Sequence, residues 1–166
     1  VRTMMYDPDG RLTTYLAYPD DEIINTYNPA GWLVDQTFNP AGFNDITQYD
    51  DAGQITRLYE QANRDLVFTY DPVGNRKSIF DNILFAWTET GALSTWTYDI
   101  ANRMVTSVEG SALTTYTFET NGNLTGINEA AGLTTMAYDK ENRLISHITH
   151  DTATPTTYTY DGTGLK

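Results

Sequence analysis

Hydrophobic and polar residues alternate along most of this chain, in short runs separated by turn-forming residues. The alternating run 66–70 and the runs 113–118 and 156–160 are rich in Thr, Val and aromatic residues. These side chains suit an extended, half-buried backbone, so the runs are predicted to be β-strands. No stretch has the three- and four-residue apolar spacing of an amphipathic helix. The fold class predicted from the pattern is therefore all-β.

One short phrase separates the runs and occurs eleven times. An aromatic residue begins it, Asp, Asn or Glu follows in ten cases, and Gly or Asn lies four residues after the aromatic. The aromatic residues are Tyr6, Tyr27, Phe38, Tyr49, Tyr59, Tyr70, Trp87, Tyr98, Phe118, Tyr138 and Tyr160. The fourth-position residues are Gly10, Gly31, Gly42, Gly53, Asn63, Gly74, Gly91, Asn102, Gly122, Asn142 and Gly164. Such regularity indicates an array, whose function belongs to an assembled surface rather than to one pocket.

The spacing of the phrase gives the size of the repeating unit. Tyr27, Phe38 and Tyr49 are eleven residues apart, and from Tyr98 onward the phrase returns every 20 to 22 residues. A strand of about six residues and a turn of about four fill one basic unit, and two units make a full repeat. We predict an antiparallel meander of about fifteen strands joined by tight turns.

The chemistry of the phrase is that of a hairpin turn. Gly and Asn both tolerate positive φ, so their shared position is predicted to adopt it. The acid or Asn before them accepts hydrogen bonds from backbone N–H groups two residues on. Pro follows that residue at Pro8, Pro29, Pro40 and Pro72, where its fixed φ suits a type I turn. The phrase predicts a strand end, a type I turn, a left-handed residue and a bulge.

We expect the most regular copies of the phrase to be structural rather than functional. The residues assigned to this turn motif are Tyr6, Asp7, Gly10, Tyr27, Gly31, Tyr49, Asp50, Gly53, Tyr70, Asp71, Gly74, Tyr98, Asp99, Asn102, Tyr138, Asp139, Asn142, Tyr160, Asp161 and Gly164. The arginine after the turn residue, at Arg11, Arg64, Arg103 and Arg143, is expected to pair with an Asp of a neighbouring turn, which favours register more than stability.

Several copies of the phrase resemble the YD repeats of RHS-type proteins. The four that carry the resemblance are Tyr6-Asp7-Pro8-Asp9-Gly10-Arg11-Leu12, Tyr70-Asp71-Pro72-Val73-Gly74-Asn75-Arg76, Tyr98-Asp99-Ile100-Ala101-Asn102-Arg103-Met104 and Tyr138-Asp139-Lys140-Glu141-Asn142-Arg143-Leu144. The resemblance extends over essentially the whole chain. It implies a β-hairpin ribbon that curls into part of a hollow shell or barrel-like sheet. Such shells occur in bacterial polymorphic toxins, in insecticidal toxin complexes and in teneurins.

Composition limits the possible functions. Ten Lys and Arg against 22 Asp and Glu give a net charge of −12, which repels phosphates and argues against a nucleic-acid partner. The absence of Cys excludes disulfides, zinc–thiolate sites and thiol nucleophiles. No run of 18 apolar residues predicts a membrane-spanning helix.

Two clusters are candidates for metal binding or catalysis. His147 and His150, with Asp151, are the only histidine group and are candidates for a general base or for metal ligands. Residues three apart on a strand face opposite sides, which opposes joint ligation unless a turn intervenes. Asp20, Asp21 and Glu22 form the densest acidic run and are candidates for a divalent cation, although a solvated turn explains them as well. No cofactor is firmly implied.

The aromatic residues are the candidates for ligand binding. On an exposed face, the rings of Trp32, Trp87 and Trp96 would stack on sugars, whereas packing within the sheet is the structural alternative.

Three functional hypotheses follow. The first is a structural shell segment of a secreted RHS-type toxin protein, which encloses cargo or associates with itself. In it, residues 1–166 are one YD-repeat β domain and a fragment of a longer array. Its partners are the rest of an RHS-type chain or another copy through the edge strands, with toxin cargo or glycans beyond them. The second is a carbohydrate-binding or adhesion module at a bacterial cell surface. The third is a metal-assisted hydrolase around His147 and His150.

Overall fold

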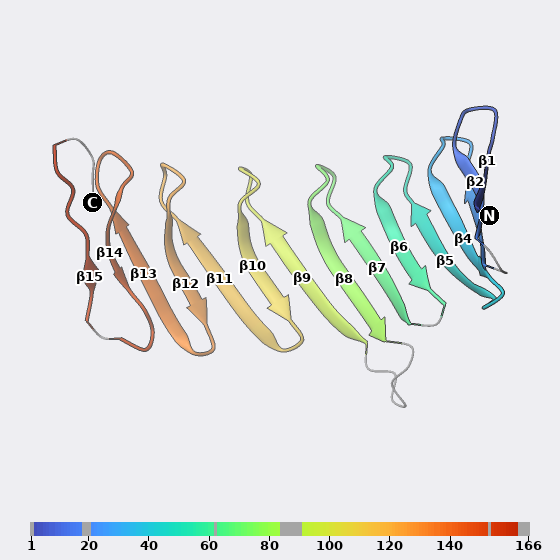
Figure 1. Ribbon diagram of the computed structural model, residues 1–166. Coiled ribbons are helices and arrows are strands. Elements are labelled where there is room, and N and C mark those ends of the chain that lie inside the picture. The colour runs from blue at the N-terminus through green and yellow to red at the C-terminus, as the bar shows by residue number, and fades with distance from the viewer. Residues whose placement is uncertain (1, 18–20, 62, 84–90, 153, 163–166) are drawn as a thin grey trace. The chain divides into compact units, whose positions relative to one another are not determined.

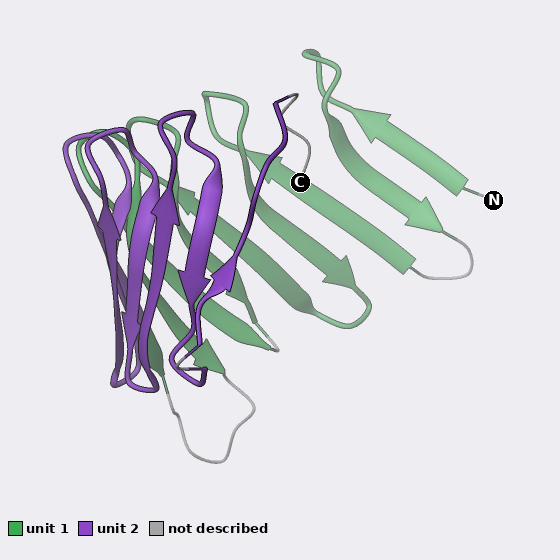
Figure 2. Ribbon diagram, turned by 90° about the vertical axis from the view of Figure 1, so that its left-hand side faces the viewer, with its two compact units in different colours: residues 1–93 green, residues 94–166 purple. Residues whose placement is uncertain are grey.

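The computed structural model describes residues 2–17, 21–61, 63–83, 91–152 and 154–162, and within these ranges it contains fifteen strands. The chain divides into two compact units, Val1–Leu93 and Ser94–Lys166, which are coloured separately in Figure 2. All the strand pairs are antiparallel, and they join strands that follow one another in the chain. The all-β, antiparallel hairpin prediction is confirmed.

The first unit contains eight strands in sequential order (Figure 1). They are β1 (Arg2–Tyr6), β2 (Leu12–Ala17), β3 (Asp21–Tyr27), β4 (Leu33–Asn39), β5 (Phe43–Tyr49), β6 (Ile55–Glu60), β7 (Arg64–Tyr70) and β8 (Arg76–Ile83). The second unit contains seven, the first of which begins two residues before the boundary. They are β9 (Ala92–Tyr98), β10 (Met104–Glu109), β11 (Ala112–Phe118), β12 (Leu124–Glu129), β13 (Gly132–Tyr138), β14 (Leu144–Ile148) and β15 (Thr156–Thr157).

Two kinds of turn alternate along each unit. Long turns of five residues lie at one end of the strands and join β1 to β2, β3 to β4 and so on through β13 to β14. These five-residue turns span residues 7–11, 28–32, 50–54, 71–75, 99–103, 119–123 and 139–143. Shorter turns, such as the two residues between Glu109 and Ala112, lie at the opposite end of the strands. The alternation explains why a full repeat contains two strand-and-turn units.

A bulge accompanies each five-residue turn. The register shifts by one residue just before the aromatic of the phrase, so that Tyr6 pairs with Leu12 and Tyr138 with Leu144. The residue before the last turn position has positive φ, with values of 79° at Gly10, 58° at Asn102 and 61° at Asn142. This is the geometry that the exchange of Gly for Asn predicts, because a β-bulge of this type needs a left-handed residue.

The phrase does not form the same turn everywhere. The Tyr59 phrase makes a shorter turn in which Glu60 pairs with Arg64 and the Asn63 N–H donates to the Glu60 carbonyl at 2.8 Å. The φ angles of Asn63 and Gly91 involve residues 62 and 90, which lie outside the described residues, so positive φ stays a prediction at both positions. In the Phe38 phrase Gly42 has positive φ, but Phe38 pairs directly with Phe43 and the Asn39–Pro40 bond is cis. Gly164 lies outside the described residues.

Few side chains are buried. Among the described residues, the buried side chains are those of Phe68, at 7% exposure, and Ser107, at 8%. Both faces of each sheet keep half-exposed side chains, and large apolar residues such as Met4, Leu113 and Leu133 are exposed. Each strand is therefore stabilised mainly by its two neighbours, as in repeat proteins.

The positive φ at Asn142 gives a direct test of the turn geometry. Asn142→Ala is expected to lower the free energy of unfolding by about 1–2 kcal/mol, because a Cβ without local hydrogen bonding is disfavoured there. Asn142→Gly is expected to lower it by less than Asn142→Ala does, because both variants lose the hydrogen bond from the Asn123 side chain, at 2.9 Å, but Gly keeps the backbone free to adopt positive φ. Gly162→Ala is the control, since no positive φ is found at Gly162 and a Cβ there would meet open space. Urea unfolding of the three variants measures the differences, and an equal loss at positions 162 and 142 would contradict the assignment.

Candidate functional site

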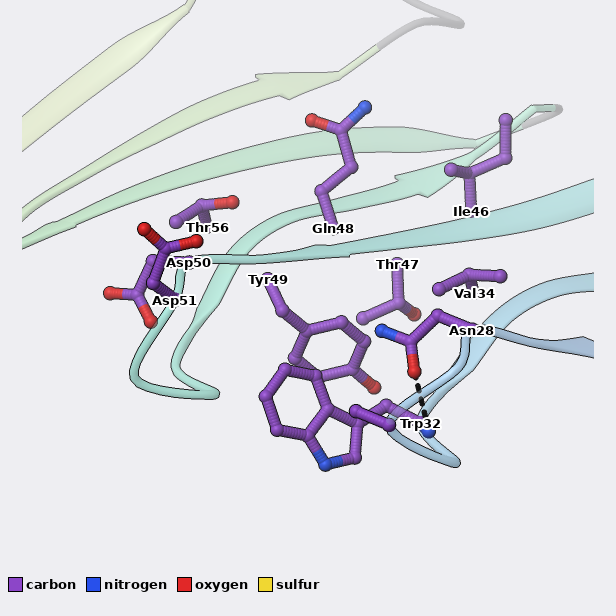
Figure 3. Close-up of a pocket in the computed structure, with 11 residues that line it drawn as sticks. Asn28, Trp32, Val34, Ile46, Thr47, Gln48, Tyr49, Asp50, Asp51 and Thr56 are labelled. Atoms are coloured by element: carbon purple, nitrogen blue, oxygen red, sulfur yellow. Dashed lines mark hydrogen bonds between the residues drawn. The ribbon is translucent and has the colours of Figure 1, made fainter.

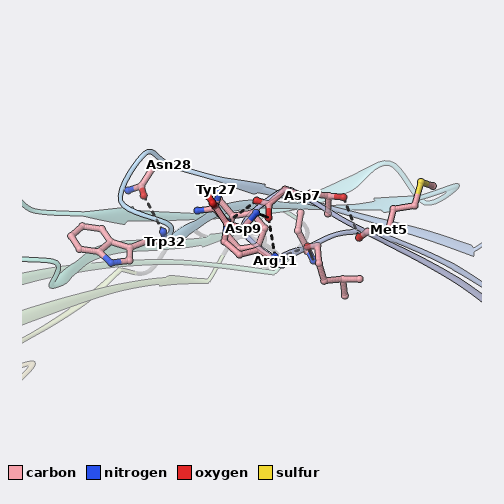
Figure 4. Close-up of polar contacts among 10 residues, drawn as sticks. Met5, Asp7, Asp9, Arg11, Tyr27, Asn28 and Trp32 are labelled. Carbon is pink, nitrogen blue, oxygen red and sulfur yellow. Dashed lines mark hydrogen bonds and ion pairs between the residues drawn. The ribbon is translucent and has the colours of Figure 1, made fainter.

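The five-residue turns are the most regular feature of the molecule. In each, the first residue's N–H donates to the carbonyl of the fifth residue, and the fourth residue's N–H donates to the carbonyl of the first. All fourteen distances lie between 2.9 and 3.0 Å. In the turn 7–11, shown in Figure 4, Asp7 is the first residue and Arg11 the fifth. The backbone is thus closed into the same loop seven times.

The carboxylate of the first residue holds the interior of the turn. Asp7 Oδ1 accepts hydrogen bonds from the backbone N–H groups of Asp9 and Arg11 at 3.0 and 2.9 Å. Asp50, Asp71, Asp99 and Asp139 accept the equivalent pair. An Asp side chain reaches these groups with no rearrangement of the turn, which explains its frequency after the aromatic.

The fifth residue bonds back to the acid of its own turn. Arg11 Nε lies 2.6 Å from Asp7 Oδ2, and the Arg103–Asp99 and Arg143–Asp139 pairs have the same contact at 2.7 Å. The expectation that these arginines pair with a neighbouring turn was wrong, because the five-residue loop brings its own ends together. Arg64, which follows no such turn, does reach another strand and pairs with Asp81 on β8.

The fifth residue also covers the aromatic that precedes the next turn. The guanidinium carbon lies 5.1 Å from the ring centroid for Arg11 over Tyr27, 4.7 Å for Arg103 over Phe118 and 4.8 Å for Arg143 over Tyr160. These are cation–π distances. In the turn 28–32 a tryptophan takes this place, and Trp32 lies 5.0 Å from Tyr49. In these four turns, the fifth side chain therefore links the turn to the aromatic residue that precedes the next one.

Where the aromatic residue before the next turn is Tyr, its hydroxyl can add a hydrogen bond to the preceding hairpin. Tyr27, Tyr49, Tyr70 and Tyr160 each donate to the carbonyl of the residue that follows the preceding five-residue turn. The acceptors are Leu12, Leu33, Ile55 and Leu144, at 2.8 to 3.0 Å. In β2 the ladder to β3 begins only at Thr14, so the hydroxyl of Tyr27 bonds a carbonyl beyond the end of that ladder. This contact explains why Tyr is preferred to Phe in the phrase.

The turn bonds shift the ionisation of the acids. The backbone N–H of Arg11 lowers the pKa of Asp7, with its guanidinium adding to the effect and partial burial opposing it. The pKa of Asp99 is lowered in the same way by Arg103. Asp45, on β5, differs: burial raises its pKa, and the nearby Glu60 and Asp35 carboxylates add to the rise.

The histidine candidates lie in different surroundings. His147 lies on β14, and its Nδ1 is 3.0 Å from the Tyr158 hydroxyl, with the two rings stacked at 5.7 Å. His150 lies beyond the strand, against Gly132. The pKa of Asp151 is lowered, first by a hydrogen bond from Thr149. No group of three possible metal ligands is found in the part of the chain that the structure describes.

The acidic candidates and Trp96 lie on different strands. Asp21 and Glu22 lie on β3, where Glu22 accepts a hydrogen bond from Asn39 at 2.9 Å. Trp96 lies on β9 opposite Ser107. Asp20 and Trp87 lie outside the described residues. No helix in the described ranges is long and apolar enough to cross a membrane.

Trp32 lines a cavity. The cavity has a volume of about 700 Å³ and also borders Asn28, Thr47, Tyr49, Asp50 and Asp51 (Figure 3). Trp32 reaches it from the end of the turn 28–32, with its backbone N–H held by the side-chain oxygen of Asn28 at 3.0 Å. The sequence named Trp32 as a candidate for stacking on a ligand, and that role stays a prediction. The other residues that border the cavity are brought there by the register between strands.

The tyrosine hydroxyl contact can be tested without changing the ring. Tyr70→Phe removes the bond to the Ile55 carbonyl and is expected to lower the free energy of unfolding by about 0.5–1.5 kcal/mol. Tyr15→Phe, in the same unit, is the control for a hydroxyl outside the turn contacts and is expected to change it by less. Urea denaturation compares the two, and an equal effect would contradict a role for the hydroxyl in joining the turns.

The lowered pKa values of the turn acids predict acid sensitivity. Their carboxylates stabilise the fold above about pH 4, the ordinary Asp range, and this contribution is lost as pH falls through the lower folded-state pKa values. The melting temperature is expected to fall between pH 5 and pH 3. Asp99→Asn, which retains the backbone acceptor as Asn28 does, is expected to flatten that fall.

Asp45 provides the opposite case. Its raised pKa means that its carboxylate opposes folding at neutral pH, and the cost disappears on protonation. Asp45→Asn is therefore expected to raise the melting temperature at pH 7 and to steepen the loss on acidification. Parallel pH profiles for the wild type and both variants would contradict these assignments.

Comparisons with known proteins were informative at the level of structure. No family model matches the chain, and no curated protein matches it. A crystal structure of TcdB2–TccC3–Cdc42 matches with a TM-score of 0.63 at 19% identity, over 86% of this chain and 9% of that chain. Crystal structures of TcdB2–TccC3–TEV and of TcdB2–TccC3 without its hypervariable C-terminal region match with TM-scores of 0.59 and 0.58, at 15% and 16% identity. Each of these two covers 98% of this chain and 11% of that chain.

This chain thus spans about a tenth of the chains that it resembles. At such low identity the matches establish a common fold. Two independent observations now agree, since the repeated phrase resembles YD repeats and the structure superposes on segments of these much longer chains. The resemblance to RHS-type YD-repeat shells is confirmed at the level of the fold.

Proposed function

We propose that this chain is a wall segment of a longer RHS-type YD-repeat shell in a secreted toxin-type protein. The observation that carries the proposal is the contact from the fifth residue of a turn to the next aromatic, which four of the seven turns make and which occurs in both units. Such a contact can recur along a longer chain, because a turn can supply one half of it while the aromatic before that turn receives the other half. It suits a ribbon that extends through a long chain.

The low burial of both faces supports the same role. Phe68 and Ser107 are the buried side chains of the described part, so neither unit has a conventional core. A sheet of this kind serves as a wall that separates two volumes. The small share of the related structures that it spans, 9 to 11%, is consistent with one segment of a larger enclosure. That the complete shell encloses a cargo and is secreted is the part of the proposal that rests on the resemblance to RHS-type proteins.

The edge strand β1 makes the proposal testable. All five of its residues are exposed, and it pairs with β2. In a continuous wall its other edge would pair with a further strand, because unpaired backbone N–H and C=O groups are templates for strand addition. The isolated chain is therefore expected to associate through this edge, with a mass that rises with concentration.

Light scattering coupled to size-exclusion chromatography measures that mass. A double variant, Met4→Lys with Met5→Lys, places charge on both faces of β1 and is expected to shift the protein toward monomer. Leu133→Lys is the matched control, because Leu133 and Met4 are 54% and 53% exposed but Leu133 lies on the inner strand β13. Equal loss of association in the double variant and the control, or a wild-type monomer at all concentrations, would overturn edge pairing.

A further inference from the structure

The cavity beside Trp32 lies where one five-residue turn contacts the aromatic residue before the next. The contact there is between two aromatic rings, whereas at Arg11, Arg103 and Arg143 it is a cation–π contact. Where Arg11, Arg103 or Arg143 closes a turn, the guanidinium lies over the next aromatic and bonds the acid of its own turn. Each such junction contains an aromatic face, a cation and a carboxylate. The chemistry of the junction is therefore that of a filled cation site.

The junction between the turns 28–32 and 50–54 lacks the cation. Asn28 replaces the acid and Trp32 replaces the arginine, while Tyr49 keeps the aromatic position. The indole packs tightly on the next turn, since a Cβ on Gly53 would lie 2.8 Å from the ring. Two π faces are thus present at this junction, 5.0 Å apart and tilted by 46°.

The charges that line the cavity are all negative. Asp50 and Asp51 border it, and none of its eleven lining residues is Lys, Arg or His. Asp50 is engaged within its turn, where it accepts hydrogen bonds from Ala52 and Gln54. Asp51 is exposed at the rim of the turn, as Figure 3 shows beside Asp50. Its carboxylate borders the cavity and lies outside the hydrogen bonds that hold Asp50 in the turn.

We propose that this cavity binds an organic cation, a guanidinium or alkylammonium group, from outside the chain. The negative π faces of Trp32 and Tyr49 and the carboxylate of Asp51 attract such a group, and no residue that lines the cavity neutralises them. The net charge of −12 raises the local concentration of cations. The volume of about 700 Å³ accommodates a small cation or the side chain of an Arg or Lys from another protein.

This site is independent of the wall function, since it requires the turns 28–32 and 50–54 and no further strand. Its occupant is defined by charge rather than by shape. A neutral sugar would also stack on Trp32, so the decisive comparison is between a cation and a neutral molecule of the same shape.

Ethylguanidinium and ethylurea are that matched pair. Saturation-transfer difference NMR, which tolerates self-associated protein, measures their binding to the full chain. Ethylguanidinium is expected to bind saturably and to weaken as salt increases, and ethylurea is expected to give no saturable signal. Equal binding of the two would overturn the proposal and indicate a site for neutral ligands.

Three variants locate the site. Trp32→Ala is expected to weaken ethylguanidinium binding by about two- to thirtyfold, the range of one cation–π contact. Asp51→Asn is expected to weaken it and to reduce its salt dependence. Trp32→Arg is the sharpest variant, because it supplies the internal cation found over Tyr27 and Phe118 and is expected to abolish binding.

Trp96→Phe and Asp9→Asn are the controls, a tryptophan on another strand and an exposed acid of another turn, and both are expected to bind as the wild type does. Circular dichroism verifies the fold of each variant. Unchanged binding in both Trp32→Arg and Asp51→Asn would overturn the assignment even if the wild-type protein binds the cation.

Discussion

The structure depends on the contact between the fifth residue of one turn and the aromatic residue before the next. Where that fifth residue is Arg, it makes two contacts at once: it bonds the acid of its own turn, and it covers the next ring. The first contact fixes the loop and the second fixes the loop's position against its neighbour. Either a guanidinium or an indole fulfils the second role, as Arg103 and Trp32 show. The sheets bury few side chains and are stabilised instead by contacts that recur between turns at the ends of the strands.

Some positions of the five-residue turn are restricted to a few residue types, whereas its fifth position varies. The first residue of the turn and its left-handed fourth residue are determined by backbone geometry, so they change only among Asp, Asn and Glu, or between Gly and Asn. The fifth residue is determined by its contacts and varies more widely, from Arg to Trp, Gln and Asn. Variation at that position changes the local chemistry without changing the fold. The cavity at Trp32 is one result of such a change.

Local rules account for what the sequence predicted correctly. The Gly-to-Asn exchange predicted positive φ at Asn102 and Asn142, because few other residues tolerate it. The phrase at Tyr59 forms a shorter turn, in which Glu60 pairs with Arg64, so the phrase alone does not determine the length of the turn. The partner of Arg103 was missed because a one-to-five contact within a loop leaves no periodic signal. Aligning the seven turns on their fifth residue would have shown Trp32 as the one aromatic residue at that position, but its cavity requires the register between strands.

A double-mutant cycle between Arg103 and Phe118 tests the account most directly. Arg103→Gln, Phe118→Leu and the double variant are compared by urea unfolding, with Arg103 and Tyr138, which are two turns apart, as the reference pair. The account predicts a coupling free energy of about 0.5–1 kcal/mol for the adjacent pair and a value near zero for the reference pair. Additive effects in both cycles would show that successive turns are not energetically joined, and would contradict it.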